Sequence, residues 1–180
     1  MNLEEYGNFY HVDISTQIEN KWKNDTVLAI VKNNQKYSIR IKSRDKELIK
    51  KRFIIDEPSK KEKKYNKRVV TIVYCYLLYK ALVDFKEANP LLICRDVRPE
   101  RYVLYYLQKI SNLFNNKDVM RKEIKFRKRI EFGTKEKLPK SLAGKYVRKV
   151  YQGKLKSSKI LLNDEVEELI RIIESFEKPL

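Results

Sequence analysis

Four acidic side chains lie within a predicted strand or next to the beginning or end of a predicted strand or helix. Asp13 lies in the alternating run HVDIS, and Asp96 follows the apolar run LLIC and one arginine, just before a helical segment. Asp164 and Glu165 open the last helical segment, in LNDEVEEL. Carboxylates from separate elements can share Mg²⁺, because this hard ion takes oxygen ligands and keeps several waters. Asp13 and Asp96 are therefore candidate metal ligands, and Asp164 or Glu165 would complete a catalytic site.

The chemistry that such a site would perform is cleavage of a phosphodiester. Two Mg²⁺ or Mn²⁺ ions, roughly 3.5 to 4 Å apart, neutralise the attacking and the leaving oxygen. Open sheets that contain parallel strands place their ligands beyond the carboxyl ends of those strands. Asp13 on a central strand and Asp96 at the carboxyl end of the neighbouring strand could therefore bind the same ion.

Each acid also has an ordinary structural interpretation. Asp13 could be a hydrogen-bonded strand residue, since a buried carboxylate needs compensating partners. Asp96 could stabilise the positive end of the helix that follows it, and the same reasoning applies more strongly to Asp164 and Glu165. His11 lies on the same strand face as Asp13, and a lone histidine is usually structural. Both interpretations of the acids stay open.

Two groups of cations accompany the acids. Arginines surround Asp96 in CRDVRPER, and basic residues alternate with Tyr146 and Tyr151 in KSLAGKYVRKVYQGK. Lysine and arginine neutralise phosphates, and tyrosine can stack on unpaired bases. The alternative is a solvated run of charges with tyrosines in the core. The candidate nucleic-acid-binding residues are Arg95, Arg98, Arg101, Lys140, Lys145, Arg148 and Lys149.

The charge of the chain favours a polyanionic partner. Its 180 residues carry 41 lysines and arginines against 24 aspartates and glutamates, a net charge of +17. Such an excess repels itself and is typical of proteins that bind nucleic acid. Hydrophobic residues make up 42% of the chain, which is enough for a packed core. We expect nucleic acid, either DNA or RNA, with an acidic protein or a membrane surface as the alternative.

Cysteine usage and hydropathy indicate the compartment. Cys75 and Cys94 lie in apolar runs without metal-like spacing, which predicts buried thiols and no disulfide. The longest apolar run, residues 69–79, is too short to cross a bilayer. We therefore expect a soluble cytoplasmic protein without a membrane partner. The chain has no phosphate-binding glycine loop and only one histidine, which argues against zinc hydrolysis and histidine-based nucleophilic catalysis.

The elements that must position these residues begin with three strands. Residues 9–15, 26–32 and 35–41 are rich in β-formers, and Asn33-Asn34 predicts a two-residue hairpin turn. The alternation within residues 35–41 predicts an antiparallel sheet with one wetter face.

Helices and strands then alternate. Residues 44–53 predict a short helix, and Ser59 with Glu62 predicts a capping box for a long, largely buried helix that ends near Lys86. The remaining predicted elements are a buried strand at 91–95, a helix at 99–114, a strand at 123–132, a basic loop with a short helix at 133–159, and a last helix capped by Asn163. Together they predict one α/β domain, residues 1–180, with helices packed on a mixed sheet.

This order of elements resembles the ribonuclease H-like superfamily. In that family an aspartate lies on the first strand, a second ends the fourth strand just before a helix, and an acid stands near the start of the last helix. HVDIS, CRDVRPERYVLYYLQKI and LNDEVEEL supply Asp13, Asp96 and Asp164 or Glu165 at these places. The resemblance implies a three-stranded antiparallel meander followed by alternating helices and strands, and a Mg²⁺-dependent nuclease.

The chain departs from the family pattern at two places. The glutamate expected early in the first long helix is not assigned to one residue: Glu62 lies in that helix but is explained by capping, and Glu47 in the preceding short helix is the other candidate. The glycine-rich first hairpin is also absent. Three hypotheses follow: a metal-dependent nuclease, a non-catalytic nucleic-acid-binding protein on a similar fold, and a basic assembly protein that docks on an acidic partner.

Overall fold

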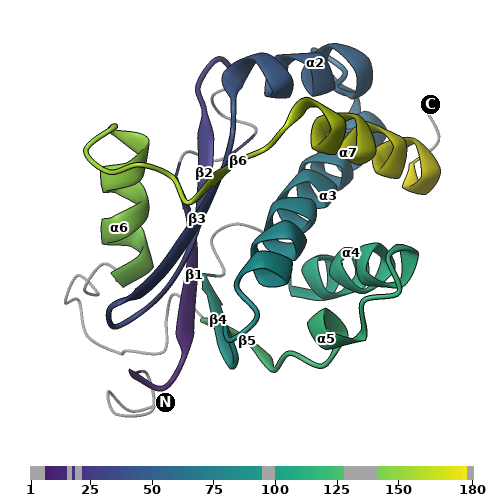
Figure 1. The fold of residues 1–180 in the computed structure, drawn as a ribbon. Coiled ribbons are helices and arrows are strands. Elements are labelled where there is room, and N and C mark those ends of the chain that lie inside the picture. Colours follow the sequence, from purple (N-terminus) through teal and green to yellow (C-terminus); the bar gives the residue numbers. More distant parts are fainter. Residues whose placement is uncertain (1–6, 16–17, 19–21, 95–99, 128–141, 178–180) are drawn as a thin grey trace, which may run out of the picture.

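The computed structural model of the chain describes residues 7–15, 18, 22–94, 100–127 and 142–177 (Figure 1). Its strands are β1 (Tyr10–Ser15), β2 (Thr26–Lys32), β3 (Gln35–Ile41), β4 (Leu91–Cys94), β5 (Ile124–Arg127) and β6 (Lys159–Ile160). Its helices are α2 (Ser43–Phe53), α3 (Lys60–Asp84), α4 (Glu100–Leu113), α5 (Lys117–Met120), α6 (Leu142–Tyr151) and α7 (Asn163–Phe176).

The strands form one mixed sheet in the order β5-β4-β1-β2-β3-β6. β1, β2 and β3 are antiparallel neighbours, which confirms the predicted meander. β4 pairs with β1 in parallel, with Val12 opposite Ile93, and β5 continues the sheet in parallel beyond β4. β1 is therefore a central strand, and β4 is its neighbour on the side away from β2.

The turn between β2 and β3 forms as the two asparagines predict. Lys32 pairs with Gln35, so that only two residues join the strands, and Asn33 has φ +51°. Asparagine tolerates this left-handed conformation better than most residues, because its short polar side chain can bond locally. The turn fixes the register that decides which side chains of β2 and β3 face which helix layer.

The larger core lies between the sheet and α3. Ser59 and Glu62 form the predicted capping box, since each side chain accepts a hydrogen bond from the other residue's backbone N–H. From Val69 onward α3 is buried on nearly all sides, because the sheet covers one side of it while α4 and α7 cover others (Figure 1). Tyr74 and Tyr76 are among its largest fully buried side chains. The prediction of a central helix is confirmed.

A smaller core lies on the other face of the sheet, under α6 (Figure 1). It consists of alternate residues of β2 and the inner face of α6, namely Val27, Ala29, Val31, Ala143, Val147 and Val150. This is the wetter face of β3, since Lys36 is exposed and Arg40 is only partly buried, but Ser38 is fully buried there. The alternation in β3 thus reflects a second helix layer that covers part of this face.

The remaining differences from the predictions concern the shortest elements and one cap. The four-residue α5 and the two-residue β6 are too short to produce a hydrophobic period. Leu162, not Asn163, is the N-cap of α7, because the Leu162 backbone N–H donates to Glu165 Oε2 at 3.0 Å. Residues 128–132 of the predicted fifth strand lie outside the described ranges.

Candidate nucleic-acid interface

Asp13 lies in the middle of the sheet, on the face that α6 covers. It pairs with Ala29 of β2, and cross-strand partners point to the same face. Ala29 belongs to the core under α6. Asp13 is partly buried, and its Oδ1 accepts a hydrogen bond from the backbone N–H of Ile14 at 2.8 Å. It therefore has at least one structural partner within its own strand.

The predicted relation between the first and fourth strands is present, but only one of its two aspartates is described. β4 ends at Cys94, beside β1 and parallel to it, and Asp96 follows two residues later in the sequence. Asp96, Arg95, Arg98 and Lys140 lie outside the described residues. Whether Asp96 faces Asp13 stays a prediction.

Glu165 is held in a network of ion pairs on the opposite side of the sheet. Its Oε1 lies 2.8 Å from the Nζ atoms of both Lys80 and Lys159, and its Oε2 accepts the Leu162 N–H. Burial alone would raise the pKa of this carboxyl, but hydrogen bonds from Lys159, Lys80 and the Leu162 amide outweigh it and lower the pKa to about 2. Lys159 also reaches Asp84 at 3.2 Å. The network fastens α7 and β6 to α3.

The structure therefore does not bring Glu165 together with Asp13. α3 and α7 lie on one face of the sheet, and Asp13 lies on the other (Figure 1). Asp164 is exposed at the start of α7. Within the described residues, no group of three His, Cys, Asp or Glu side chains could hold a metal ion. The described acids do not fit a two-ion centre.

A cluster of exposed cations is the strongest functional feature on the sheet face that contains Asp13. Lys145, Arg148 and Lys149 are exposed on α6, and Lys154 and Lys156 are exposed in the segment that follows. We name these five side chains the α6 surface. None of them forms an ion pair with a described residue. Lys154 and Lys156 were not among the predicted residues, although the sequence contains no acid between Glu136 and Asp164.

Packing and a terminal cap hold α6 in place. The helix ends in a Schellman motif, in which Gly153 N–H donates to the Val150 carbonyl at 3.1 Å and Lys154 N–H donates to the Lys149 carbonyl at 2.9 Å. Gly153 has φ +74°, a conformation that favours glycine. The chain reverses at this cap, which brings Lys154 and Lys156 beside the end of α6. Their positive charges therefore add to those of the helix.

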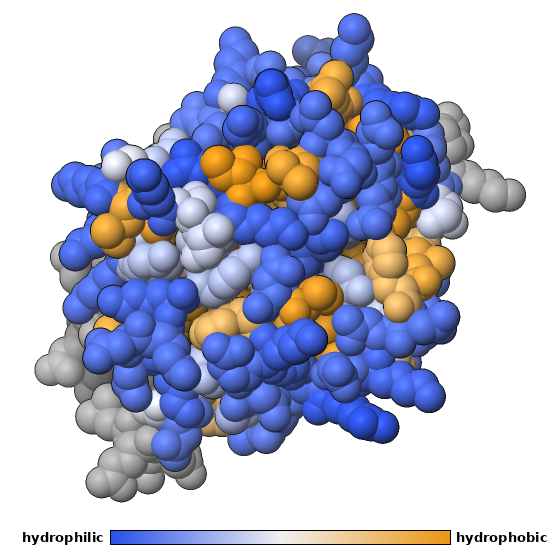
Figure 2. Space-filling model, in the orientation of Figure 1, coloured by the Kyte–Doolittle hydropathy of each residue, from blue (hydrophilic) through white to orange (hydrophobic). Residues whose placement is uncertain are grey.

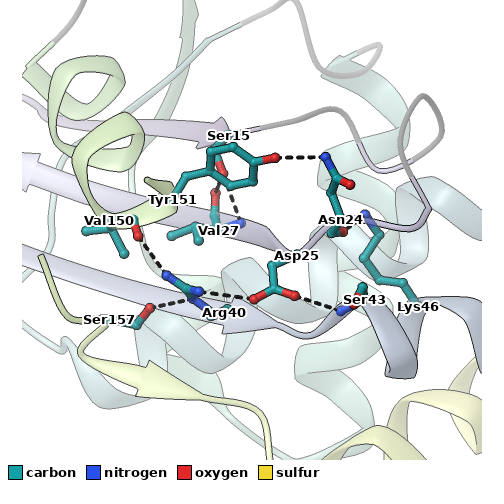
Figure 3. Close-up of polar contacts among 10 residues, drawn as sticks. All are labelled: Ser15, Asn24, Asp25, Val27, Arg40, Ser43, Lys46, Val150, Tyr151 and Ser157. Carbon is teal, nitrogen blue, oxygen red and sulfur yellow. Dashed lines mark hydrogen bonds and ion pairs between the residues drawn. The ribbon is translucent and has the colours of Figure 1, made fainter. Parts of the chain in front are cut away.

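Arg40 of β3 clamps the end of α6 to the sheet (Figure 3). Its guanidinium donates to the Val150 carbonyl at 2.7 Å, to Ser157 Oγ at 3.0 Å and to Asp25 Oδ2 at 3.0 Å. Asp25 Oδ1 in turn accepts the Ser43 N–H at 2.9 Å. Hydrogen bonds from a charged donor are stronger than neutral ones, so this clamp positions the α6 surface firmly.

The two tyrosines of α6 also serve as anchors. The hydroxyl groups of Tyr146 and Ser38 lie 3.4 Å apart, and the Tyr151 hydroxyl accepts a hydrogen bond from Asn24 Nδ2 at 2.9 Å (Figure 3 shows the latter). Both rings are half-buried and pack against the smaller core. Stacking on bases was the expectation for these rings, but the structure gives them a packing role.

Arg101, the remaining predicted cation, lies far from the α6 surface. It is exposed in the first turn of α4, on the α3 side of the sheet (Figure 1). Its guanidinium carbon stands 4.8 Å from the centre of the Tyr102 ring. The described members of the predicted set therefore divide between two separate surfaces.

The described elements define a mixed α/β protein with helices on both faces of a six-stranded sheet. No protein family, curated protein or solved structure matches the chain. Among the helices that the structure describes, none is both long and apolar enough to cross a membrane. Among the described residues, Cys75 is a buried thiol that forms no disulfide, and its Sγ donates to the Val103 carbonyl at 3.5 Å.

Proposed function

We propose that the protein binds nucleic acid through the α6 surface. The observation that carries this proposal is a rigidly anchored helix end with five exposed cations and no acidic ion-pair partner among the described residues. An uncompensated cluster of this kind repels itself, and the phosphates of a nucleic acid would relieve the repulsion. The same face carries no exposed aromatic ring on α6, so that the expected contacts are with the backbone rather than the bases.

We also propose that the fold is ribonuclease H-like. The supporting observation is the strand arrangement: an antiparallel meander whose first strand, β1, is also the parallel neighbour of β4. The resemblance requires this adjacency, because Asp13 on the first strand and Asp96 after the fourth strand would have to share one ion. A fold of this type would serve as the scaffold for binding whether or not the protein retains a catalytic centre.

The test compares two variants that remove the same charge. The first is Lys145→Gln, Arg148→Gln, Lys149→Gln; the control is Lys60→Gln, Lys61→Gln, Lys64→Gln, whose lysines are exposed at the start of α3. We expect the α6 variant to lose at least about tenfold in affinity for a short DNA or RNA duplex at moderate salt. Its log Kd against log salt should also become shallower by about 2.7, since each phosphate contact contributes about 0.9.

The control should lose much less affinity. Equal losses in the two variants would show that net charge alone governs binding and would contradict the α6 proposal. If the unaltered protein has little affinity for oligonucleotides at moderate salt, the protein is better explained as a basic assembly protein.

A second candidate function is metal-dependent phosphodiester cleavage, which the parallel pairing of β1 with β4 favours. The described acids do not form a metal site by themselves, so this candidate depends on Asp13 together with Asp96. The expected result is Mg²⁺- or Mn²⁺-dependent cleavage that Asp13→Asn abolishes without weakening binding. Binding without cleavage by the unaltered protein would leave the non-catalytic function.

A further inference from the structure

The outer face of α4 exposes two aromatic rings. Val103, Tyr106, Leu107 and Ile110 form the buried face of this helix. Tyr102 and Tyr105 lie on the other face, 38% and 50% exposed, and so contribute little to the core. The chain thus keeps two large rings in partial contact with water, outside the buried face of α4.

Cations flank these rings. Arg101, Tyr105 and Lys109 recur at intervals of four residues, which places them along one side of the helix over about 12 Å. Arg101 lies over the Tyr102 ring at 4.8 Å, and Lys109 Nζ lies 5.1 Å from the centre of the Tyr105 ring. Lys109 also contacts the Phe176 ring at 4.6 Å. We name Arg101, Tyr102, Tyr105 and Lys109 the α4 stripe.

The tyrosines of the α4 stripe differ from the buried tyrosines of the protein. Tyr106 donates to Glu177 Oε1 at 2.6 Å, and Tyr76 donates to Glu168 Oε1 at 2.5 Å, so both hydroxyls hold helices together. The Tyr105 hydroxyl has no hydrogen-bond partner among the described residues. Its ring makes an edge contact with Tyr106, with 5.0 Å between centres, which leaves much of the ring open to a ligand.

The chemistry of the α4 stripe matches unpaired nucleotides. Bases of single strands stack on aromatic side chains, while neighbouring lysines and arginines contact the phosphates. A duplex keeps its bases stacked on one another and offers these rings nothing comparable. One exposed acid, Glu100, lies at the start of α4, and Glu177 near the buried face is neutralised by Arg68 at 2.8 Å.

A hydrophobic protein partner fits this face less well. The exposed leucines of α4, Leu104 and Leu113, are nine positions apart, or about 13 Å along the helix axis. In the view of Figure 2 the apolar side chains form small separate patches within a hydrophilic surface. Scattered apolar residues of this kind are normal on soluble proteins and do not define a protein interface.

We propose that the α4 stripe is a second nucleic-acid-binding surface, specific for unpaired bases. The inference rests on the proposed affinity for nucleic acid but not on the α6 surface, which lies across the sheet. The tyrosines of α6 are occupied in packing, so Tyr102 and Tyr105 of α4 are the rings that would stack on bases. The protein would therefore bind duplex through α6 and single strands through both surfaces.

The experiment compares three probes of equal length: a fluorescent oligothymidylate, its fully abasic counterpart with the same phosphates, and a duplex. The test variant is Tyr102→Leu, Tyr105→Leu, which keeps helix propensity, and the control is Tyr102→Phe, Tyr105→Phe, which keeps both rings. We expect the leucine variant to bind oligothymidylate about tenfold or more weakly. Its affinity for the abasic strand and the duplex should not change, and the phenylalanine control should bind all three as the unaltered protein does.

Three outcomes would overturn the inference: equal binding of thymidylate and abasic strands by the unaltered protein, unchanged thymidylate binding by the leucine variant, or the same loss in the phenylalanine control. An unchanged leucine variant would point to a protein partner for α4. The α6 variant separates the two proposals, because it should lose duplex binding while it still prefers thymidylate to the abasic strand. If it keeps its duplex affinity, the α6 proposal fails and the result for α4 stands.

Discussion

At the scale of single residues, Glu165 shows how one carboxylate can suggest catalysis and yet serve the fold. Its position at the start of the last helix suits a metal ligand in the sequence. In the structure two lysines and a backbone amide occupy its oxygens. A carboxylate so enclosed by cations is stabilised in its charged form and has little capacity left for a metal ion.

Glu165→Gln should lower the free energy of unfolding by about 2 kcal/mol at pH 7, because it leaves Lys80 and Lys159 without their shared partner. The pKa of Glu165 is depressed from 4.5 to about 2, so its stabilising contribution is complete above pH 4.5 and is lost as the pH falls toward 2. Urea unfolding at pH 7 and pH 2.5 measures this. The difference between the two proteins should be smaller at the lower pH.

Glu167→Gln is the matched control on the same helix. Glu167 pairs with Arg171 at 3.6 Å, and both side chains are exposed. Exposed pairs of this kind contribute less than about 0.5 kcal/mol. A control as damaging as Glu165→Gln, or a Glu165 effect that does not depend on pH, would contradict the structural role given to Glu165.

At the scale of elements, α6 depends on its attachment to the sheet. The helix has only ten residues, and isolated helices of this length are marginal in water. Ala143, Val147 and Val150 on its inner face, together with the Arg40 clamp, therefore maintain its structure. The cations on its outer face can be numerous because the inner face supplies the stability.

Arg40→Ala should loosen the end of α6 without removing a cation of the α6 surface. We expect a loss of about 2 kcal/mol, since three hydrogen bonds disappear and the Val150 carbonyl keeps no partner from β3. Hydrogen exchange of residues 148–158 should accelerate, while that of α3 should change little. The control is Lys51→Ala, which removes the same charge from an exposed site. If hydrogen exchange of residues 148–158 accelerated equally in this control, the proposed role of Arg40 as a clamp would be contradicted.

The sequence predicted the elements that carry a strong local signal. The asparagine turn, the capping box at Ser59 and the apolar run of α3 each depend on neighbouring residues, and all three were confirmed. The layer that covers β3 was not predictable, because alternation alone does not tell solvent from a second helix layer. β6 was not predicted either, because its two residues carry no local pattern and are ordered by distant contacts with β3 and by the ion pair of Lys159 with Glu165.

The candidate site was predicted less well than the fold. The adjacency of β1 and β4 was correct, because alternating strands and helices restrict the possible sheet orders. The role of Glu165 was missed, because its partners Lys80 and Lys159 lie far from it in the sequence or on an unrecognised strand. Tyr146 and Tyr151 have the same residue type as base-stacking rings, and only their packing distinguishes them.

At the scale of the whole molecule, a charge of +17 works against compactness. The described ion pairs neutralise part of it, but the cations of the α6 surface stay uncompensated. Like charges repel one another over about 30 Å at 0.01 M ionic strength but over only about 10 Å at 0.1 M, because salt screens the repulsion. Stability should therefore increase with ionic strength.

We expect the melting temperature to rise by several degrees between 20 mM and 500 mM sodium chloride. A duplex oligonucleotide should produce a similar rise at low salt, because a ligand that binds only the folded state stabilises it. Differential scanning fluorimetry measures both. A melting temperature that falls with salt would mean that favourable ion pairs outweigh the repulsion.

The short contact between β3 and the segment after α6 bears on how the protein behaves at high concentration. Lys159 and Ile160 pair with β3, and Ser158 and Ser38 exchange reciprocal hydrogen bonds between side-chain oxygen and backbone N–H. β6 is the last strand on this side of the sheet, and it is only two residues long. The ladder that it offers to a second copy is therefore short, which disfavours the growth of fibrils through this side in a crowded solution.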